Sequence, residues 1–208
     1  MAEGLFITLE GVEGSGKLTL ARALEGRLRD AGHDVLRLRE PGGTSLGEAV
    51  RSVVLDPSHG DVSPWAELFL MLSARAQIVH ELITPALVAG RTVLCDRFMD
   101  ASTAYQGAGR GLGIDAVEAL NDRATAGVHP DLTFLLDLDP AVGRKRQTHA
   151  PDRMEQAALD FHRAVREGYR TVAERHPDRV VLLDAGLGPE EVAAAAWESL
   201  ATRFPDQA

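Results

Sequence analysis

The fold is decided by the stretch Leu5-Phe6-Ile7-Thr8-Leu9-Glu10-Gly11-Val12-Glu13-Gly14-Ser15-Gly16-Lys17-Leu18-Thr19. Its first five residues are apolar or β-branched and predict a buried strand, and the residues from Lys17 onward predict a helix. The seven residues from Gly11 to Lys17 match G-x-x-x-x-G-K, the pattern of a phosphate-binding loop. Its glycines let backbone N–H groups turn toward an anion, and the following helix N-terminus and the lysine add positive charge. The opening of the chain therefore predicts a strand, a phosphate loop over residues 11–19 and a helix.

Apolar runs of strand length alternate with longer helical patterns along the rest of the chain. The expected strands are residues 5–9, 34–39, 92–95, 132–136 and 180–183. The expected helices are residues 17–31, 45–55, 63–89, 114–126, 141–146, 154–175 and 189–203, with a kink or restart at Pro85 and a loop over residues 107–113. This alternation predicts an α/β fold of three layers, with a five-stranded parallel sheet covered by helices on both faces. No linker or repeat is visible, so we expect one domain over residues 1–208.

Composition narrows the class of partner. The chain has 208 residues, 45% of them hydrophobic and 25% charged, and a formal net charge of −9. An acidic chain is a poor ligand for a nucleic acid polymer, because phosphate contacts need clustered Lys and Arg. Cys95 is the only cysteine, the start at Met1 lacks a basic signal region, and no uncharged run approaches the ~18 residues of a membrane span. We expect a cytoplasmic protein without a membrane partner.

One position departs from the phosphate-loop pattern. The residue after the loop lysine is usually Ser or Thr, whose hydroxyl binds Mg²⁺. Here it is Leu18, followed by Thr19. Since neighbouring helical residues point about 100° apart, Thr19 is not expected to take over this role.

Further polar motifs come directly after the second and third expected strands. They are Arg39-Glu40-Pro41-Gly42-Gly43-Thr44, then Asp96-Arg97, with Ser102-Thr103-Ala104-Tyr105-Gln106 shortly afterwards. Because ligands bind beyond the carboxyl ends of parallel strands, these residues and the phosphate loop should share one crevice. Together with Pro130-Asp131-Leu132 and Asp152-Arg153-Met154-Glu155, they resemble the bacterial thymidylate kinases nearly from end to end.

This resemblance implies a P-loop nucleoside-monophosphate kinase that moves the γ-phosphoryl group of ATP to dTMP, with Mg²⁺ as cofactor. The product is dTDP, a DNA precursor, and the family implies a homodimer. The resemblance places dTMP against Glu13, Arg39, Met71, Arg75, Arg97, Ser102, Tyr105 and Gln106. It places ATP against Gly11, Val12, Glu13, Gly14, Ser15, Gly16, Lys17, Leu18, Thr19 and Arg146. It assigns catalysis to Lys17, Asp96, Arg97 and Arg153, and Mg²⁺ binding to Asp96.

Individual roles follow from the same resemblance. Glu13 touches the acceptor sugar, Arg97 bridges the two phosphates and Arg75 pairs with the thymine edge. Tyr105 lies against the deoxyribose, where it would crowd a 2′-OH. Met71 stands where the family commonly has a phenylalanine that stacks on thymine, and methionine can cover the base but cannot stack.

A lid is expected over about residues 144–156. There the resemblance implies that Arg153 supplies charge to the transition state and that Arg146 packs against adenine. The middle of this lid, residues 147–151, carries no arginine and is thinner than the family pattern. Two alternatives therefore stay open: a kinase for another nucleoside monophosphate, suggested by Met71, and a weakly active nucleotide-binding relative, suggested by Leu18 and the thin lid.

Overall fold

The structure, a computed structural model, describes residues 4–148 and 150–205. Residues 1–3, which belong to the start considered for a signal region, and His149 in the expected lid lie outside the described residues. Within the described part of the chain, no helix is both long and apolar enough to cross a membrane.

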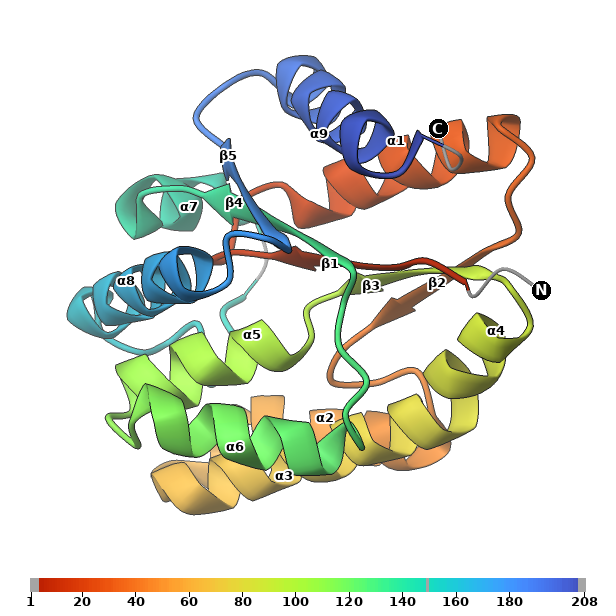
Figure 1. Ribbon diagram of the computed structural model, residues 1–208. Coiled ribbons are helices and arrows are strands. Elements are labelled where there is room, and N and C mark those ends of the chain that lie inside the picture. The colour runs from red at the N-terminus through yellow and green to blue at the C-terminus, as the bar shows by residue number, and fades with distance from the viewer. Residues whose placement is uncertain (1–3, 149, 206–208) are drawn as a thin grey trace.

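A five-stranded parallel sheet forms the centre of the molecule, as predicted (Figure 1). The strands are β1 (Phe6–Glu10), β2 (Val35–Arg39), β3 (Thr92–Asp96), β4 (Leu132–Asp137) and β5 (Val180–Asp184). Their order across the sheet is β2-β3-β1-β4-β5. Each lies within one residue of the expected range. The central strands β1, β3 and β4 are buried on both faces and read as short, nearly continuous apolar runs.

Helices cover both faces of this sheet (Figure 1). The helices α1 (Lys17–Asp30) and α9 (Pro189–Arg203) pack together on one face, and α4 (Thr84–Val88) and α8 (Leu159–Arg175) lie on the other. The helices α2 (Ser45–Leu55), α3 (Pro64–Ile78) and α6 (Ile114–Ala124) lie farther out on that second side, and the short helix α7 (Pro140–Arg146) leads into the lid. A 3₁₀ turn, η1 (Pro57–His59), follows α2.

The long helix expected over residues 63–89 is interrupted. After α3 the chain makes one π-helical turn, η2 (Val79–Ile83), and the α-helix restarts as α4 at Thr84. Pro85 has no N–H, so it cannot complete the regular hydrogen-bond ladder of a continuous helix. The predicted kink or restart at Pro85 is confirmed.

The first part of the loop expected over residues 107–113 is helical, so the predicted start at residue 107 is wrong. Instead of a loop, α5 (Met99–Ser102) continues into a π-helix, η3 (Thr103–Gly109), whose first five residues are buried. Its glycines serve close packing: a Cβ on Gly109 would lie 2.7 Å from the Phe161 ring. On α8, a Cβ on Gly168 would lie 2.6 Å from the Ala108 side chain. This segment is thus a packed helix rather than a flexible connection.

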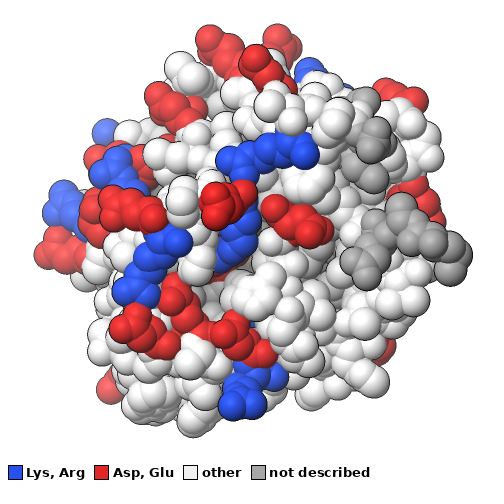
Figure 2. All heavy atoms as spheres, in the orientation of Figure 1, with Lys and Arg blue, Asp and Glu red and all other residues white. Residues whose placement is uncertain are grey.

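Charged side chains of both signs are mixed on the face shown in Figure 2, mainly toward the side of α7 and α8. Arg166 of α8 joins this helix to the sheet, because it donates to both carboxylate oxygens of Asp137, the last residue of β4, at 2.6 and 2.8 Å. No large area of a single charge sign stands out on this face.

Candidate active site

Two neighbouring cavities open at the carboxyl edge of the sheet. The parallel register pairs Leu9 with Asp96 and Arg39 with Asp96, so the last residues of β1, β2 and β3 lie at the same edge. One cavity, of about 410 Å³, lies against the phosphate loop, and the other, of about 170 Å³, lies between the sheet edge, α2, α3 and η3. We call them the donor cavity and the acceptor cavity. Both are lined by Glu13, Glu40, Arg51, Arg97 and Glu155, so they adjoin one another.

The phosphate loop joins β1 to α1 as predicted. Gly14 adopts a φ of 71°, a left-handed conformation that glycine tolerates, and a Cβ there would lie 2.3 Å from the Gly143 carbonyl oxygen. Lys17 is largely buried, and its Nζ donates to the carbonyl oxygens of Gly11 and Val12 at 3.0 and 3.1 Å. Burial, followed by the positive charge of Arg97, lowers the pKa of Lys17 to about 8. A bound phosphate would offset both effects.

Leu18 and Thr19 face different spaces, as expected for neighbouring helical residues. Leu18 has 53% of its surface exposed and lines the donor cavity with Lys17 and Asp96. Thr19 lines a separate recess together with Arg146 and Leu187. The Thr19 hydroxyl therefore does not replace the missing hydroxyl at position 18.

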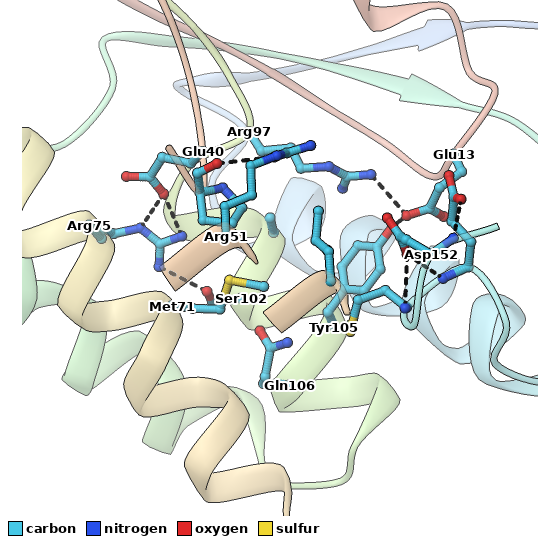
Figure 3. Close-up of a pocket in the computed structure, with 15 residues that line it drawn as sticks. Glu13, Glu40, Arg51, Met71, Arg75, Arg97, Ser102, Tyr105, Gln106 and Asp152 are labelled. Atoms are coloured by element: carbon cyan, nitrogen blue, oxygen red, sulfur yellow. Dashed lines mark hydrogen bonds and ion pairs between the residues drawn. The ribbon is translucent and has the colours of Figure 1, made fainter. Parts of the chain in front are cut away.

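Arg97 lies where the two cavities meet (Figure 3). Its backbone φ of 68° is unusual for a residue other than glycine. Its guanidinium donates to Glu13 Oε1 at 3.0 Å and to the Tyr169 hydroxyl at 3.0 Å, and it lies 5.0 Å from the Tyr105 ring centre. The Tyr105 hydroxyl also donates to Glu13 Oε1, at 2.5 Å. Burial by itself would raise the pKa of Glu13, but Arg97 and Lys17 outweigh it and lower that pKa, so Glu13 is ionised at neutral pH.

A buried acid, Glu10, contacts the residues that hold Arg97 in place. Glu10, the last residue of β1, is fully buried, accepts the Phe98 N–H at 2.7 Å and accepts the Tyr169 hydroxyl at 2.8 Å. Burial, and then the neighbouring charge of Asp100, raises the pKa of Glu10 to about 8. One carboxyl group thus contacts both the backbone after Arg97 and the tyrosine that holds its guanidinium.

Arg75 lies on the opposite wall of the acceptor cavity from Glu13 (Figure 3). It pairs with Glu40 Oε2 through Nε at 2.8 Å and through an Nη at 2.7 Å. Its remaining N–H groups donate to Ser102 Oγ, Asn121 Oδ1 and the Phe98 carbonyl oxygen, at 2.7 to 2.8 Å. The protein therefore engages all three guanidinium nitrogens of Arg75, and direct pairing of Arg75 with a base remains a prediction.

Several other predicted acceptor residues also line this cavity. Met71 of α3, Ser102 at the end of α5, and Tyr105 and Gln106 of η3 all do so. Arg51 of α2 lines both cavities and donates to the Pro41 carbonyl oxygen at 3.0 Å, although no role was predicted for it from the sequence. The only signal for Arg51 was its position on the helix that follows the Arg39–Thr44 motif.

Two of the three remaining predicted arginines, Arg39 and Arg153, lie elsewhere than the motifs alone suggested, while Arg146 lies beside the donor cavity. Arg39 lines the donor cavity rather than the acceptor cavity, and its side chain is exposed and bound to Glu48 at 3.0 and 3.1 Å. Arg146 donates to the Ala185 carbonyl oxygen at 3.1 Å and borders both the donor cavity and the recess that holds Thr19. Arg153 lines neither cavity and points to Glu67, at 2.8 Å, so its predicted catalytic contact is not formed here and stays a prediction.

Comparison with known proteins agrees with this geometry. The thymidylate kinase family profile matches residues 9–196. A thymidylate kinase of Deinococcus radiodurans is 51% identical over 205 residues, covering 98% of this chain and 99% of the relative. One of Halalkalibacterium halodurans is 44% identical over 208 residues, with coverage of 98% and 99%. A crystal structure of thymidylate kinase from Ehrlichia chaffeensis superposes with a TM-score of 0.79 at 30% identity and covers 95% of this chain and 98% of that one. The predicted fold class is confirmed, and the chain belongs to the thymidylate kinase family.

Proposed function

We propose that the protein transfers the γ-phosphoryl group of ATP to dTMP and so makes dTDP for DNA precursor synthesis. The observation that most supports this function is that a phosphate-loop cavity and a second, partly apolar cavity adjoin at Arg97. Phosphoryl transfer requires two substrates held end to end and charge neutralisation between them, more than covalent participation by the protein. The relatives named above carry the same activity in their names.

Each side chain has a part in this proposal. ATP phosphates lie along residues 11–17, Lys17 leaves its two carbonyl partners for them, and the adenine lies in the recess beside Thr19 and Arg146. Arg97 and Arg51 face the junction, where the acceptor phosphate meets the γ-phosphate. Glu13 is ionised and held by Arg97 and Tyr105, which suits it to accept a hydrogen bond from the acceptor sugar.

Asp96 is the residue proposed to hold Mg²⁺. It ends β3, lines the donor cavity beside Lys17, and its Oδ1 is buried without a hydrogen-bond partner among the described residues. The part of the chain that the structure describes holds no group of three or more His, Cys, Asp or Glu side chains suited to a metal ion. This fits a cation bound by one carboxylate, water and the nucleotide phosphates, which it would neutralise.

The remaining parts of the proposal concern assembly and location. Leu46 and Val53 of α2 and Trp65 and Phe69 of α3 are between 43% and 53% exposed, which supports a homodimer formed through these helices. Sedimentation of the wild type and of Phe69→Glu would show a dimer and a monomer, respectively.

A net charge of −9 and a single buried cysteine support a cytoplasmic enzyme that acts on small molecules. We expect it to act as one domain with a lid over residues 144–156.

The activity is tested by coupled ADP release with MgATP and a panel of acceptors. We expect turnover of dTMP, slower turnover of dUMP, and at least about a hundredfold lower kcat/KM for CMP and AMP. Equal turnover of dTMP, CMP and AMP would refute the assignment. Turnover of none of them would favour a nucleotide-binding relative.

A further inference from the structure

Gln106 is held in one amide orientation. It is nearly fully buried on η3, lines the acceptor cavity, and its Nε2 donates to Glu67 Oε1 at 2.8 Å. The two ends of an amide have nearly the same shape, so the partner decides which end faces it. An ionised carboxylate can only accept, so it must face the NH₂ group. The carbonyl oxygen of Gln106 is then turned away from Glu67, and it has no hydrogen bond from any described residue.

Two arginines keep Glu67 ionised. Glu67, on the first turn of α3, is fully buried, and its Oε2 lies 2.8 Å from an Nη of Arg153 and 3.1 Å from an Nη of Arg110. Arg110 Nε also donates to Oε1 at 3.2 Å. Burial by itself would raise the pKa of Glu67, but the hydrogen bonds from Arg110, Gln106 and Arg153 outweigh it and lower that pKa.

Ser102, which lines the same cavity, is fixed as a hydrogen-bond donor toward that cavity (Figure 3). Ser102 Oγ accepts from an Nη of Arg75 at 2.8 Å, and a guanidinium has no acceptor atom to offer in return. Among residues 4–148 and 150–205, no acceptor is found for the Ser102 hydroxyl proton. Arg75 is itself fixed by its buried pair with Glu40. The wall thus presents an acceptor at Gln106 and a donor at Ser102.

We propose that Glu67 is a positioning residue for base selection: it turns the Gln106 carbonyl toward the acceptor base and so selects a base edge that offers an N–H beside a carbonyl oxygen. Thymine and uracil carry this edge. Cytosine carries the reverse, a ring nitrogen that accepts beside an amino group that donates, and it would leave the Gln106 carbonyl and the Ser102 hydroxyl unpaired in a buried site. The inference rests on the proposed phosphorylation of dTMP.

The test compares kcat/KM for dTMP with kcat/KM for dCMP in the wild type and in Glu67→Gln. A site built to hydrogen-bond its substrate discriminates by about 10³-fold or more. A glutamine at position 67 can donate as well as accept, so the Gln106 amide is free to turn over, and the dTMP/dCMP ratio should fall by about tenfold or more. Arg110→Lys is the matched control: it changes one Glu67 partner but keeps both the carboxylate and a positive charge beside it, so stability falls while the ratio holds.

A ratio in folded Glu67→Gln within about twofold of the wild type would overturn the inference, as would an equal fall in Arg110→Lys. If Glu67→Gln does not fold, Gln106→Leu decides, since it removes the amide and leaves Glu67 with both arginines. Its ratio should fall mainly through loss of dTMP turnover, and an unchanged ratio overturns the inference. Failure of the wild type to phosphorylate dTMP would instead refute the proposed function.

Discussion

Replacing Leu18 by threonine should raise the activity and lower the Mg²⁺ requirement. The usual hydroxyl at this position is one of the few protein ligands of Mg²⁺ in a phosphate loop, and here a leucine lines the donor cavity beside Lys17 and Asp96. The loop N–H groups and Lys17 are unaffected by the leucine. The loss therefore concerns the metal more than the nucleotide.

The structure sets the size of both effects. Full burial of a leucine contributes about 1.5–3 kcal/mol, and Leu18 is 53% exposed, so losing its apolar contacts costs about 1 kcal/mol of folding free energy. For a chain of this length that shifts Tm by about 2–4 °C. One preorganised polar contact at a reacting phosphate is worth about 1.4–4 kcal/mol, so turnover should rise about tenfold to a thousandfold.

The assay is initial rate against Mg²⁺ concentration, at saturating ATP and dTMP, for the wild type and Leu18→Thr. We expect half-saturation at a lower Mg²⁺ concentration and a higher plateau in the variant. Thr19→Val is the control, because Thr19 faces the recess beside Arg146, and its Mg²⁺ half-saturation should equal that of the wild type. Coinciding curves for the wild type and Leu18→Thr would mean that Asp96 and water hold the metal unaided, and the reasoning would fail.

Four further substitutions have defined outcomes. Lys17→Ala and Arg97→Ala should each lower kcat by about 10³-fold or more with unchanged far-UV circular dichroism, since each removes a cation at the transferring phosphate; near-normal turnover of Arg97→Ala would place the phosphates elsewhere. Met71→Phe should lower KM for dTMP about two- to tenfold through stacking on the base, and an unchanged KM would show that the base does not lie on position 71. Asp137→Asn should lose about 1–3 kcal/mol in urea unfolding at pH 7 and less at pH 3. The hydrogen bonds from Arg166 lower the pKa of Asp137, so its contribution is present above the unfolded value near 4 and is lost as pH falls through the folded value; equal losses at both pH values would contradict this.

The sequence predicted the parts of the molecule that depend on local pattern. The five strands, α1, α2 and α9 and the phosphate loop were all expected where they lie, because period, glycine spacing and burial are encoded within a few residues. The π-helix η3 was missed because Gly107 and Gly109 were interpreted as loop residues. Their reason is tertiary: Gly109 packs against Phe161, which lies on a helix that begins 50 residues later.

The site shows the same division. Motif spacing placed Lys17, Asp96 and Arg97 at the strand ends, where the parallel register brings them together. It could not predict the partner of Arg153, because Glu67 is separated from it by 86 positions and lies in a segment whose sequence indicates only a helix. A side chain predicted from its motif to face ATP is therefore found in a buried ion pair behind the acceptor cavity.

This placement of Arg153 changes the distribution of charge around the transferring phosphate. The cations that line the donor cavity are Lys17, Arg39, Arg51, Arg97 and Arg146. Arg39 is paired with Glu48, and Arg146 donates to the Ala185 carbonyl oxygen and borders the recess that holds Thr19. Residues 147–151 carry no arginine. Of the described cations that line the donor cavity, this leaves Lys17, Arg51 and Arg97. If Mg²⁺ is held by Asp96 as proposed, the cation would neutralise a larger share of the γ-phosphate charge here than in a protein that has an arginine within residues 147–151 and a hydroxyl at position 18. Leu18 and the lid without arginine would therefore both weaken charge neutralisation at the γ-phosphate. For this reason we expect Leu18→Thr to raise turnover more here than in a relative whose lid is rich in arginine.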